Sequence, residues 1–270
     1  MNSDSTGAAP ATRLRLQADG FALCRLERAA RGNALAPDIV QGVMTALHEA
    51  SARTDIHTLV LHGAGRHFCT GFDLASLPEE TDASLLARFV AIELMLTALW
   101  RAPLRTVVVA QGQIVGAGAD LFAACDQRIL AAGSALRFPG AGFGLVLGTR
   151  RLGMRVGTAR ALQWVTEGTQ VRADQAVVAG LATRVLEASP AGEGAADDEG
   201  ALLAAALATL APVSVARQTF GDLRSALDDH AADADLAALV RSAAAPGLKG
   251  RIEAYVARAA AARSASRRPA

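Results

Sequence analysis

The sequence LVLHGAGRHFCTGFDLASL, residues 59–77, decides the expected fold of this chain. It begins with a short apolar segment typical of a buried strand, passes through several glycines, and reaches Asp73 and Leu74, where a helix can start. A second stretch of similar design, QGQIVGAGADLFAACDQRIL at residues 111–130, follows the apolar segment Thr106–Ala110. Both stretches therefore predict a strand that leads into a glycine turn and then into a helix.

Strand-like and helix-like patterns also alternate outside these two stretches. Leu14–Leu26 predicts two short strands around a glycine turn. Helical spacing of apolar residues occurs at Pro37–Ala52 and at Ala83–Trp100. The chain then continues through a mainly helical region at residues 144–182 and a short strand at Arg184–Leu186. This alternation predicts an α/β fold with a mostly parallel sheet.

The C-terminal part of the chain has a different pattern. Residues 189–200, SPAGEGAADDEG, are rich in small and acidic residues, which is typical of a linker. Four helical patterns follow, at residues 201–210, 213–229, 233–244 and 248–263. The chain ends in the basic segment RSASRRPA. We therefore predict an α/β core at residues 1–200 and a helical C-terminal region at residues 201–270, with a disordered tail from about residue 264.

The composition is that of a globular chain without a strong electrostatic attraction for nucleic acid. Of the 270 residues, 51% are hydrophobic and 20% are charged, and the formal net charge is +1. This balance argues against nucleic acid or an anionic membrane as a partner. The apolar run Phe89–Trp100 contains Glu93, so we expect no membrane-spanning segment. The first residues lack the apolar run of a signal peptide, which favours a cytoplasmic location.

Neither a metal site nor a nicotinamide site is expected. The three cysteines, Cys24, Cys69 and Cys125, are far apart and have no metal-ligand spacing, and the five histidines are equally scattered. The run Gly116-Ala117-Gly118 begins like a dinucleotide-binding turn, but Leu121 stands where the third glycine of that turn would be. We therefore expect no bound metal ion and no nicotinamide cofactor.

The two glycine turns suit the stabilisation of a negatively charged oxygen. The first turn of a helix leaves backbone N–H groups free and carries the positive end of the helix dipole. Gly71 and the run Gly116–Gly118 each lie between a strand and a helix start. If the two turns face one another, they present two N–H donors to one oxygen, and one such donor is worth ~3 kcal/mol in stabilising an enolate or a tetrahedral oxyanion. Either turn by itself is also compatible with a purely structural role.

Taken together, these segments resemble the crotonase, or enoyl-CoA hydratase/isomerase, family over almost the whole chain. The two glycine stretches are similar to the two signatures of the family. Similar segments elsewhere are RGNAL at 31–35, GTRRLGMRVGTARALQWVTEG at 148–168, VVAGLATRVLE at 177–187 and GRIEAYVAR at 250–258. The resemblance implies a spiral of ββα units that is followed by a helical C-terminal region. It also implies assembly as a homotrimer or a dimer of trimers, with the last helices at subunit interfaces.

The resemblance further implies an acyl-CoA thioester as substrate. The oxyanion donors would then be the backbone N–H groups of Phe72 and Ala117. Coenzyme A arrives as part of the substrate, so no separately bound cofactor is implied. The implied substrate-binding residues are Arg28, Thr70, Gly71, Asp73, Leu74, Ala75, Gly116 and Gly140.

The acid–base residues are where this chain departs from the family. The family pattern has two glutamates, and Asp120 occupies the position of the first. Asp120 lies three residues after Ala117, so its carboxylate can reach the same side of the helix; a role in complementing the helix dipole is the alternative. Gly140 stands at the position of the second glutamate, and about three residues are missing between Val146 and Gly148. Hydration with two carboxylates is therefore in doubt.

Other polar side chains near the expected pocket leave alternatives open. Glu93 would have a raised pKa if it were buried among its apolar neighbours, but we expect it on a solvent-facing stripe with Arg88. Arg137 could face an acidic acyl group or be exposed to solvent. His67, beside the first glycine turn, is expected to be a turn residue rather than a base.

The sequence thus favours an enzyme that forms an enolate from an acyl-CoA thioester. With Asp120 as its acid–base group, double-bond migration is preferred over full hydration. Hydrolysis or decarboxylation of a thioester in the same pocket is the nearest alternative. A non-catalytic acyl-CoA-binding protein is an alternative from another class. Whether Asp120 points into the pocket or out of it separates these two classes.

Overall fold

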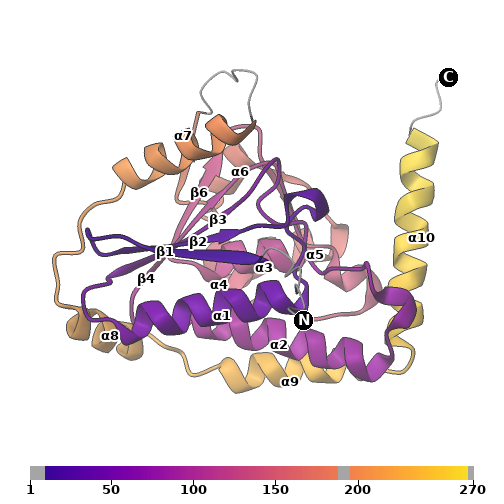
Figure 1. The fold of residues 1–270 in the computed structure, drawn as a ribbon. Helices are drawn as coiled ribbons and strands as arrows, with labels where there is room; N and C mark the ends of the chain where they lie inside the picture. The colour runs from indigo at the N-terminus through magenta and orange to yellow at the C-terminus, as the bar shows by residue number, and fades with distance from the viewer. Residues whose placement is uncertain (1–9, 188–194, 267–270) are drawn as a thin grey trace, which may run out of the picture.

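The computed structural model describes residues 10–187 and 195–266 and contains a six-stranded sheet at its centre (Figure 1). The strand order is β1-β2-β3-β4-β6-β9, in which β1 is antiparallel to β2 and each later pair is parallel. The strands are β1 (Thr12–Leu16), β2 (Phe21–Leu26), β3 (Thr58–Gly63), β4 (Arg105–Ala110), β6 (Gln127–Ala131) and β9 (Arg184–Leu186). Strands β3 and β4 are covered on both faces, which explains their continuous apolar sequences.

A second, smaller sheet has the strand order β5-β7-β8. It consists of β5 (Gln113–Val115), β7 (Ala135–Arg137) and β8 (Val171–Arg172). Strand β5 follows β4 after a turn, and strand β7 follows β6 in the same way, so the strands from β4 to β7 alternate between the two sheets. An isolated bridge between Cys69 and Ile114 brings the first glycine turn against the small sheet.

Three helices pack against one face of the large sheet and form the main core. They are α1 (Pro37–Ala52), α2 (Asp82–Trp100) and α3 (Ala117–Ala124), and Figure 1 shows α1 and α2 below the strands. One buried cluster joins side chains of all three helices to the sheet. Helix α2 begins with a capping box, in which the Ser84 N–H donates to Thr81 Oγ1 at 3.1 Å and the Thr81 N–H donates to Ser84 Oγ at 2.8 Å.

Short helices connect the other elements of the core. The α-helices are α4 (Thr149–Val156), α5 (Thr158–Glu167) and α6 (Ala173–Val178). The 3₁₀ helices are η1 (Ala29–Arg31), η2 (Leu77–Glu79) and η3 (Pro139–Phe143). Helix α4 packs against α3 and α5, which places its first turn beside the second glycine turn.

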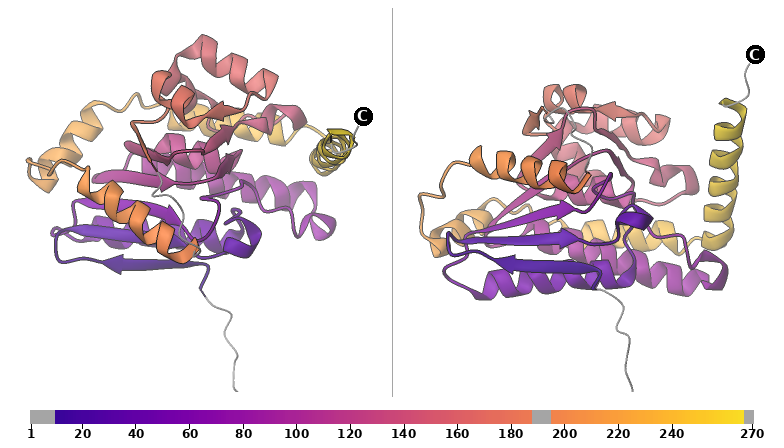
Figure 2. Two further views of the ribbon diagram at one scale, coloured as in Figure 1. Left: turned by 90° about the horizontal axis from the view of Figure 1, so that it is seen from above. Right: turned by 45° about the horizontal axis from the view of Figure 1, so that its top comes forward.

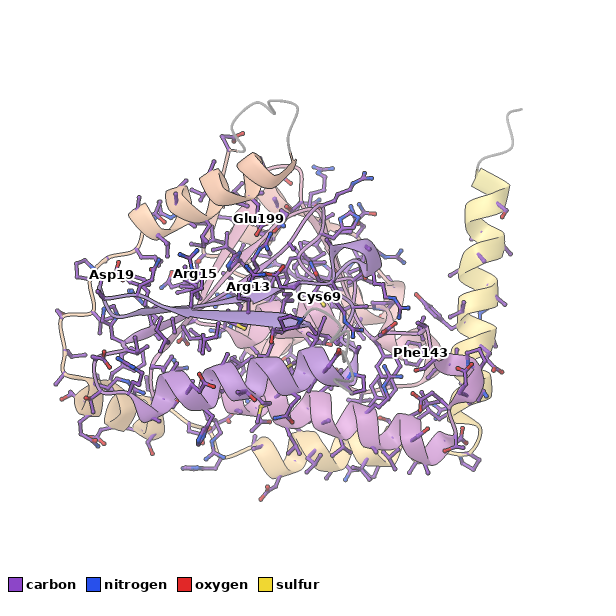
Figure 3. All side chains as sticks on the ribbon, in the orientation of Figure 1. Arg13, Arg15, Asp19, Cys69, Phe143 and Glu199 are labelled. Carbon is purple, nitrogen blue, oxygen red and sulfur yellow. The ribbon has the colours of Figure 1, made fainter. Side chains whose placement is uncertain are left out.

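The C-terminal helices are α7 (Ala195–Ala208), α8 (Arg217–Ala226), α9 (Ala232–Ala243) and α10 (Leu248–Ser266). Helix α7 crosses the face of the large sheet opposite α1 and α2 (Figure 2). Glu199 of α7, labelled in Figure 3, pairs with Arg25 of β2 at 2.7 Å. Helix α9 lies along α2, and α10 projects from the body of the molecule (Figure 1).

The predicted α/β class and the mostly parallel sheet are confirmed. The helix at Pro37–Ala52 and the strand at Arg184–Leu186 have the predicted bounds, and the other predicted strands differ from the observed ones by one or two residues at their ends. Strands β5, β7 and β8 were not predicted, because each has only two or three residues and carries too short a pattern.

Three expectations about the chain differ in part from the structure. Helix α2 is long and apolar enough, by length and composition alone, to cross a membrane, and the single Glu93 does not change that; here the helix is packed among α1, α3 and α9 as a core helix. Residues 195–200 of the predicted linker belong to α7, and residues 264–266 of the predicted tail belong to α10. The rest of the linker and tail lies outside the described residues, and the division at residue 200, which α7 crosses, stays a prediction.

Candidate active site

A cavity of about 450 Å³ lies between the two glycine turns, the 137–147 segment and helix α10. Phe143, labelled in Figure 3 near the lower end of α10, belongs to its wall. The apolar lining consists of Phe72, Leu74, Phe89, Val115, Phe138, Phe143, Leu145, Leu147, Leu152, Val165, Ile252 and Val256. A largely apolar cavity with a few polar groups is the usual form of a small-molecule site.

The first glycine turn is held by hydrogen bonds that leave one amide free. The Leu35 N–H donates to Gly71 O at 2.7 Å, and the Asp73 N–H donates back to Leu35 O at 3.4 Å. In extended backbone, successive N–H groups point to opposite sides. The Phe72 N–H therefore points away from Leu35, and it has no acceptor among the residues that the structure describes.

The second glycine turn is held in a similar way. The Gly116 N–H donates to Arg137 O at 2.8 Å, and Gly116 O accepts the Ala119 and Asp120 N–H groups at the start of α3. Ala117 is the first residue of that helix, and its N–H has no acceptor within the described chain. A Cβ placed on Gly71 would lie 3.6 Å from the Ala117 N atom, so the two turns touch. Both Phe72 and Ala117 line the cavity.

Helix α2 supports the first turn from behind. The Phe72 ring stacks on Phe89 with ring centroids 4.3 Å apart. The Arg88 guanidinium lies 4.1 Å from the centroid of the Phe72 ring and donates to Asp73 O at 2.8 Å. These contacts immobilise the segment that carries the free Phe72 amide.

Asp120 belongs to the lining of the cavity. Its residue surface is only 6% exposed, and it is the one carboxylic acid among the described lining residues. Burial raises the pKa of Asp120 well above its ordinary value; the positive charge of Arg151 opposes this effect, and the negative charge of Glu93 adds to it. A carboxyl group with a raised pKa can accept and return a proton near neutral pH.

The expected solvent-facing stripe with Glu93 and Arg88 was wrong. Glu93 is 1% exposed and forms an ion pair with Arg151, which is also 1% exposed. The Arg88 side chain is 11% exposed and pairs with Glu80 at 2.6 Å. The physical reason is that the C-terminal helices α9 and α10 pack on the side of α2 that the core leaves open.

Gly140 lies in η3 and forms part of the cavity wall. A Cβ at this position would have only Leu145 O nearby, at 3.5 Å, which is ordinary van der Waals contact. The position thus has room for the start of a larger side chain. Arg137, three residues earlier, also lines the cavity, and its Nε donates to Gly168 O at 3.3 Å.

The structure brings some of the sequence-predicted binding residues to the cavity and not others. Among them, Thr70, Gly71, Leu74, Gly116 and Gly140 line it. Arg28, Asp73 and Ala75 do not line it. Arg28 pairs with Asp38, while Asp73 accepts the Ala75 N–H at 3.0 Å within its own turn.

Several lining residues were not predicted. Gln113 and Gln170 add amide groups to the wall, and Tyr255 of α10 adds a phenol. Gln113 lies between the second apolar strand and the second glycine turn, which is a position where a lining residue could have been expected. Tyr255 is the chain's one tyrosine, but nothing in its local pattern indicates that α10 returns to the cavity.

The nearby cysteines and His67 are structural. Burial raises the pKa of both Cys69 and Cys125 to about 12, so neither thiol is ionised near neutral pH. His67 Nδ1 accepts the Gln113 N–H at 3.1 Å, and burial lowers the pKa of its ring.

The motif order, the spiral α/β architecture and a cavity bounded by both glycine turns define a protein of the crotonase class. The family model described as enoyl-CoA hydratase/isomerase matches residues 17–216. The chain therefore belongs to the enoyl-CoA hydratase/isomerase family.

Individual relatives agree with this assignment. A solved structure from Bordetella parapertussis, whose name places it in the enoyl-CoA hydratase/isomerase class, is 34% identical with a TM-score of 0.80 and covers 92% of this chain and 99% of its own. A probable enoyl-CoA hydratase of Mycobacterium leprae is 31% identical over 63% of this chain and 69% of its own length. An ethylmalonyl-CoA decarboxylase of Xenopus laevis is also 31% identical, over 64% of this chain. This match spans 60% of the decarboxylase.

Proposed function

We propose that this chain is an enzyme that converts an acyl-CoA thioester through an enolate, with Asp120 moving the proton. The observation that carries the proposal is the grouping of two unbonded backbone N–H groups, on Phe72 and Ala117, with one carboxyl group at a single apolar cavity. The two N–H groups would donate hydrogen bonds to the thioester oxygen and so stabilise the negative charge that develops on it. The family of the chain supports the substrate class.

Double-bond migration is the reaction that a single acid can complete. The ionised Asp120 carboxylate would take a proton from the α-carbon of a 3-enoyl thioester, and the electron pair of the broken C–H bond would move onto the thioester oxygen. The resulting acid would then return the proton to the γ-carbon, which gives the 2-enoyl thioester. Hydration needs a further group to activate water. The wall at Gly140 carries no such side chain.

Exchange of the α-protons for deuterium tests this proposal. We expect uptake of deuterium from solvent into a panel of acyl-CoA and enoyl-CoA thioesters, measured by mass spectrometry. Asp120→Asn should lower the exchange rate by about 10²–10⁴-fold, since a positioned general base contributes that much. Asp174→Asn, an exposed carboxylate on α6 with only a local partner, is the matched control and should exchange at the wild-type rate. Binding of the thioesters without any exchange would contradict the proposal and favour a non-catalytic acyl-CoA-binding protein.

Decarboxylation of a carboxylated acyl-CoA is a second candidate. It is favoured by the similarity to ethylmalonyl-CoA decarboxylases and by the Arg137 guanidinium on the cavity wall. Arg137 would hold the substrate carboxylate. The bond between that carboxylate and the α-carbon would break, CO₂ would leave, and the electron pair would form the enolate. Asp120 in its acid form would then protonate the α-carbon.

Release of CO₂ from an alkylmalonyl-CoA tests this second candidate. Arg137→Gln should raise KM for the carboxylated thioester by about tenfold, as expected for the loss of a charged hydrogen bond. Its KM for a thioester without the extra carboxylate should not change. Arg172→Gln, in an exposed pair with Asp174, is the control. An equal effect of Arg137→Gln on both kinds of thioester would exclude recognition of the carboxylate.

Assembly as a trimer or a dimer of trimers belongs to the same proposal. Its support is the family and the projection of α10 from the body of the molecule (Figure 1). Light scattering should give the mass of three or six chains. A monomeric mass at micromolar concentration would refute this part of the proposal.

A further inference from the structure

A buried ion network lies near the cavity, and none of its residues belongs to the cavity lining. Glu93 of α2 and Arg151 of α4 are each 1% exposed and are joined by a charged hydrogen bond. Arg151 also donates to Thr97 Oγ1 at 3.1 Å and lies 3.3 Å from a carboxylate oxygen of Asp235 on α9. Two charges are costly to bury unless they are paired and hydrogen-bonded. Three helices thus converge on one guanidinium.

The network is adjacent to Asp120 through the backbone. Gly148, which directly precedes α4, lies so close to the Asp120 carboxyl group that a Cβ on Gly148 would collide with it. Arg151 follows Gly148 by about one helical turn. The charges of Arg151 and Glu93 both act on Asp120, in opposite directions. Arg151 Nε is buried and has no hydrogen-bond partner in the part of the chain that the structure describes.

We propose that Glu93 and Arg151 form a charge-balancing pair that positions Asp120 and sets its protonation at neutral pH. This inference rests on the role proposed for Asp120 and assigns a reason for the buried pair. Burial favours the acid form of Asp120, and the charge of Arg151 favours its ionised form. Glu93 and Asp235 pair with Arg151 and oppose its charge, so that Asp120 can alternate between its acid and base forms.

Other charged groups packed around α3 do not take this role. Arg155 of α4 donates to Ala123 O at 3.1 Å, at the far end of α3. Arg150 pairs with Asp229 and Asp235 on the outer side of α4. Arg137 of β7 lines the cavity, and its Nε donates to Gly168 O at 3.3 Å.

Removing one member of the pair at a time gives opposite expectations. In Glu93→Gln, Arg151 keeps its charge and loses its partner, so the pKa of Asp120 should fall by about one unit. In Arg151→Gln, Asp120 loses the cation and remains near Glu93, so its pKa should rise by at least as much. A pair that serves only to hold helices together would not shift the pKa of Asp120 in opposite directions.

The test measures the titration of Asp120 directly. Infrared spectra of ¹³C-aspartate-labelled protein would follow the carboxylate band that disappears in Asp120→Asn. The pH profile of α-deuterium exchange would be recorded on the same variants. Asp229→Asn is the matched control, because Asp229 pairs with Arg150 and not with Arg151, and it should leave both readouts unchanged. If Arg151→Gln fails to fold, Arg151→Lys is compared with the double variant that carries both Arg151→Lys and Glu93→Gln. Of these two substitutions, only Glu93→Gln should lower the pKa of Asp120.

The possible outcomes separate this inference from the proposed function. Opposite shifts of the Asp120 band support the charge-balancing pair, even if no thioester undergoes exchange, in which case only the proposed function fails. Shifts of the same sign in both variants would overturn the inference. So would an unchanged Asp120 band in folded variants, whatever the exchange rates are.

Discussion

The two sides of the cavity are formed by different parts of the polypeptide, with backbone groups on one side and side chains on the other. On one side, the glycine turns around Gly71 and Gly116 contribute backbone groups that are fixed by hydrogen bonds and close packing. On the other, the segment from Arg137 to Gly148 contributes side chains, and it is here that the chain departs from the family pattern. Backbone donors tolerate side-chain changes such as alanine at position 117, whereas an acid is lost with one substitution. The comparison indicates that recognition of a thioester can be kept while the reaction changes.

Substitutions on the backbone side of the cavity should have the largest effects. Gly71 has φ +98°, and a Cβ there would lie 2.5 Å from Val115 O, a backbone atom that cannot yield easily. We expect Gly71→Ala to lower kcat by at least about 10²-fold, because the two amides would separate. We also expect the unfolding free energy to fall by more than ~1–2 kcal/mol, which is what backbone strain in the left-handed region alone would cost. Steady-state kinetics and urea unfolding measure the two effects.

Gly133→Ala separates strain from the close contact. Gly133 also has a positive φ, +77°, but nothing lies within 4 Å of its Cβ position. This variant should lose about 1 kcal/mol of stability and no activity. If Gly133→Ala and Gly71→Ala have equal kcat, the contact between the two turns has no role in the reaction.

Substitution of Asp120 should have the second largest effect, and this effect can be measured through the pH dependence of the unfolding free energy. The pKa of Asp120 is raised in the folded chain above the unfolded value of about 3.9. Between these two values the folded state binds more protons, so the unfolding free energy falls as pH rises, by up to about 1.4 kcal/mol per pH unit. Asparagine does not titrate.

The unfolding free energy of Asp120→Asn minus that of the wild type should therefore grow from about pH 4 upward and level off above the folded-state pKa of Asp120. Chemical denaturation at a series of pH values measures it. A constant difference across that range would show that the pKa of Asp120 is not raised in the folded protein.

The backbone side was accessible to sequence reasoning. Both glycine stretches carry local patterns that place a turn between a strand and a helix, and the resemblance to the crotonase family implies the roles of Phe72, Ala117 and Asp120 within them. The structure brings these three to one cavity. Order and spacing of the segments carry that resemblance, and each turn can be located from sequence because it is determined by its own neighbours.

The side-chain half was less accessible, because its partners are distant in sequence. Glu93 and Arg151 are 58 residues apart, and Asp235 is a further 84 residues away. The apolar sequence of α2 could not show that α9 would cover its outer side, so Glu93 was wrongly placed in solvent. Likewise, the return of α10 to the cavity depends on tertiary packing and not on local propensity.

Placing an acid at position 140, where the family pattern has one, tests the comparison through a gain of activity rather than a loss. The space at Gly140 should accept Gly140→Glu without a clash at Cβ. We expect hydration of a short 2-enoyl-CoA to rise on the order of tenfold, below the 10²–10⁴ of a fully positioned group, since the shortened loop before Gly148 does not orient the new carboxylate. Gly140→Ala is the control for loss of the glycine and should not gain hydration. An equal gain in both variants would point to a change in loop shape.

The smallest effect is expected outside the cavity wall, at Arg28. Its guanidinium pairs with Asp38 and is partly exposed, so its contribution to binding a coenzyme A phosphate is limited by solvent screening. Arg28→Gln should raise KM by about two- to fivefold, which corresponds to less than 1 kcal/mol, and leave kcat unchanged. A truncated pantetheine thioester, which lacks those phosphates, should show no change in KM. A lower kcat with either thioester would instead mean that Arg28 acts on the reacting end of the substrate, through the turn that carries Phe72.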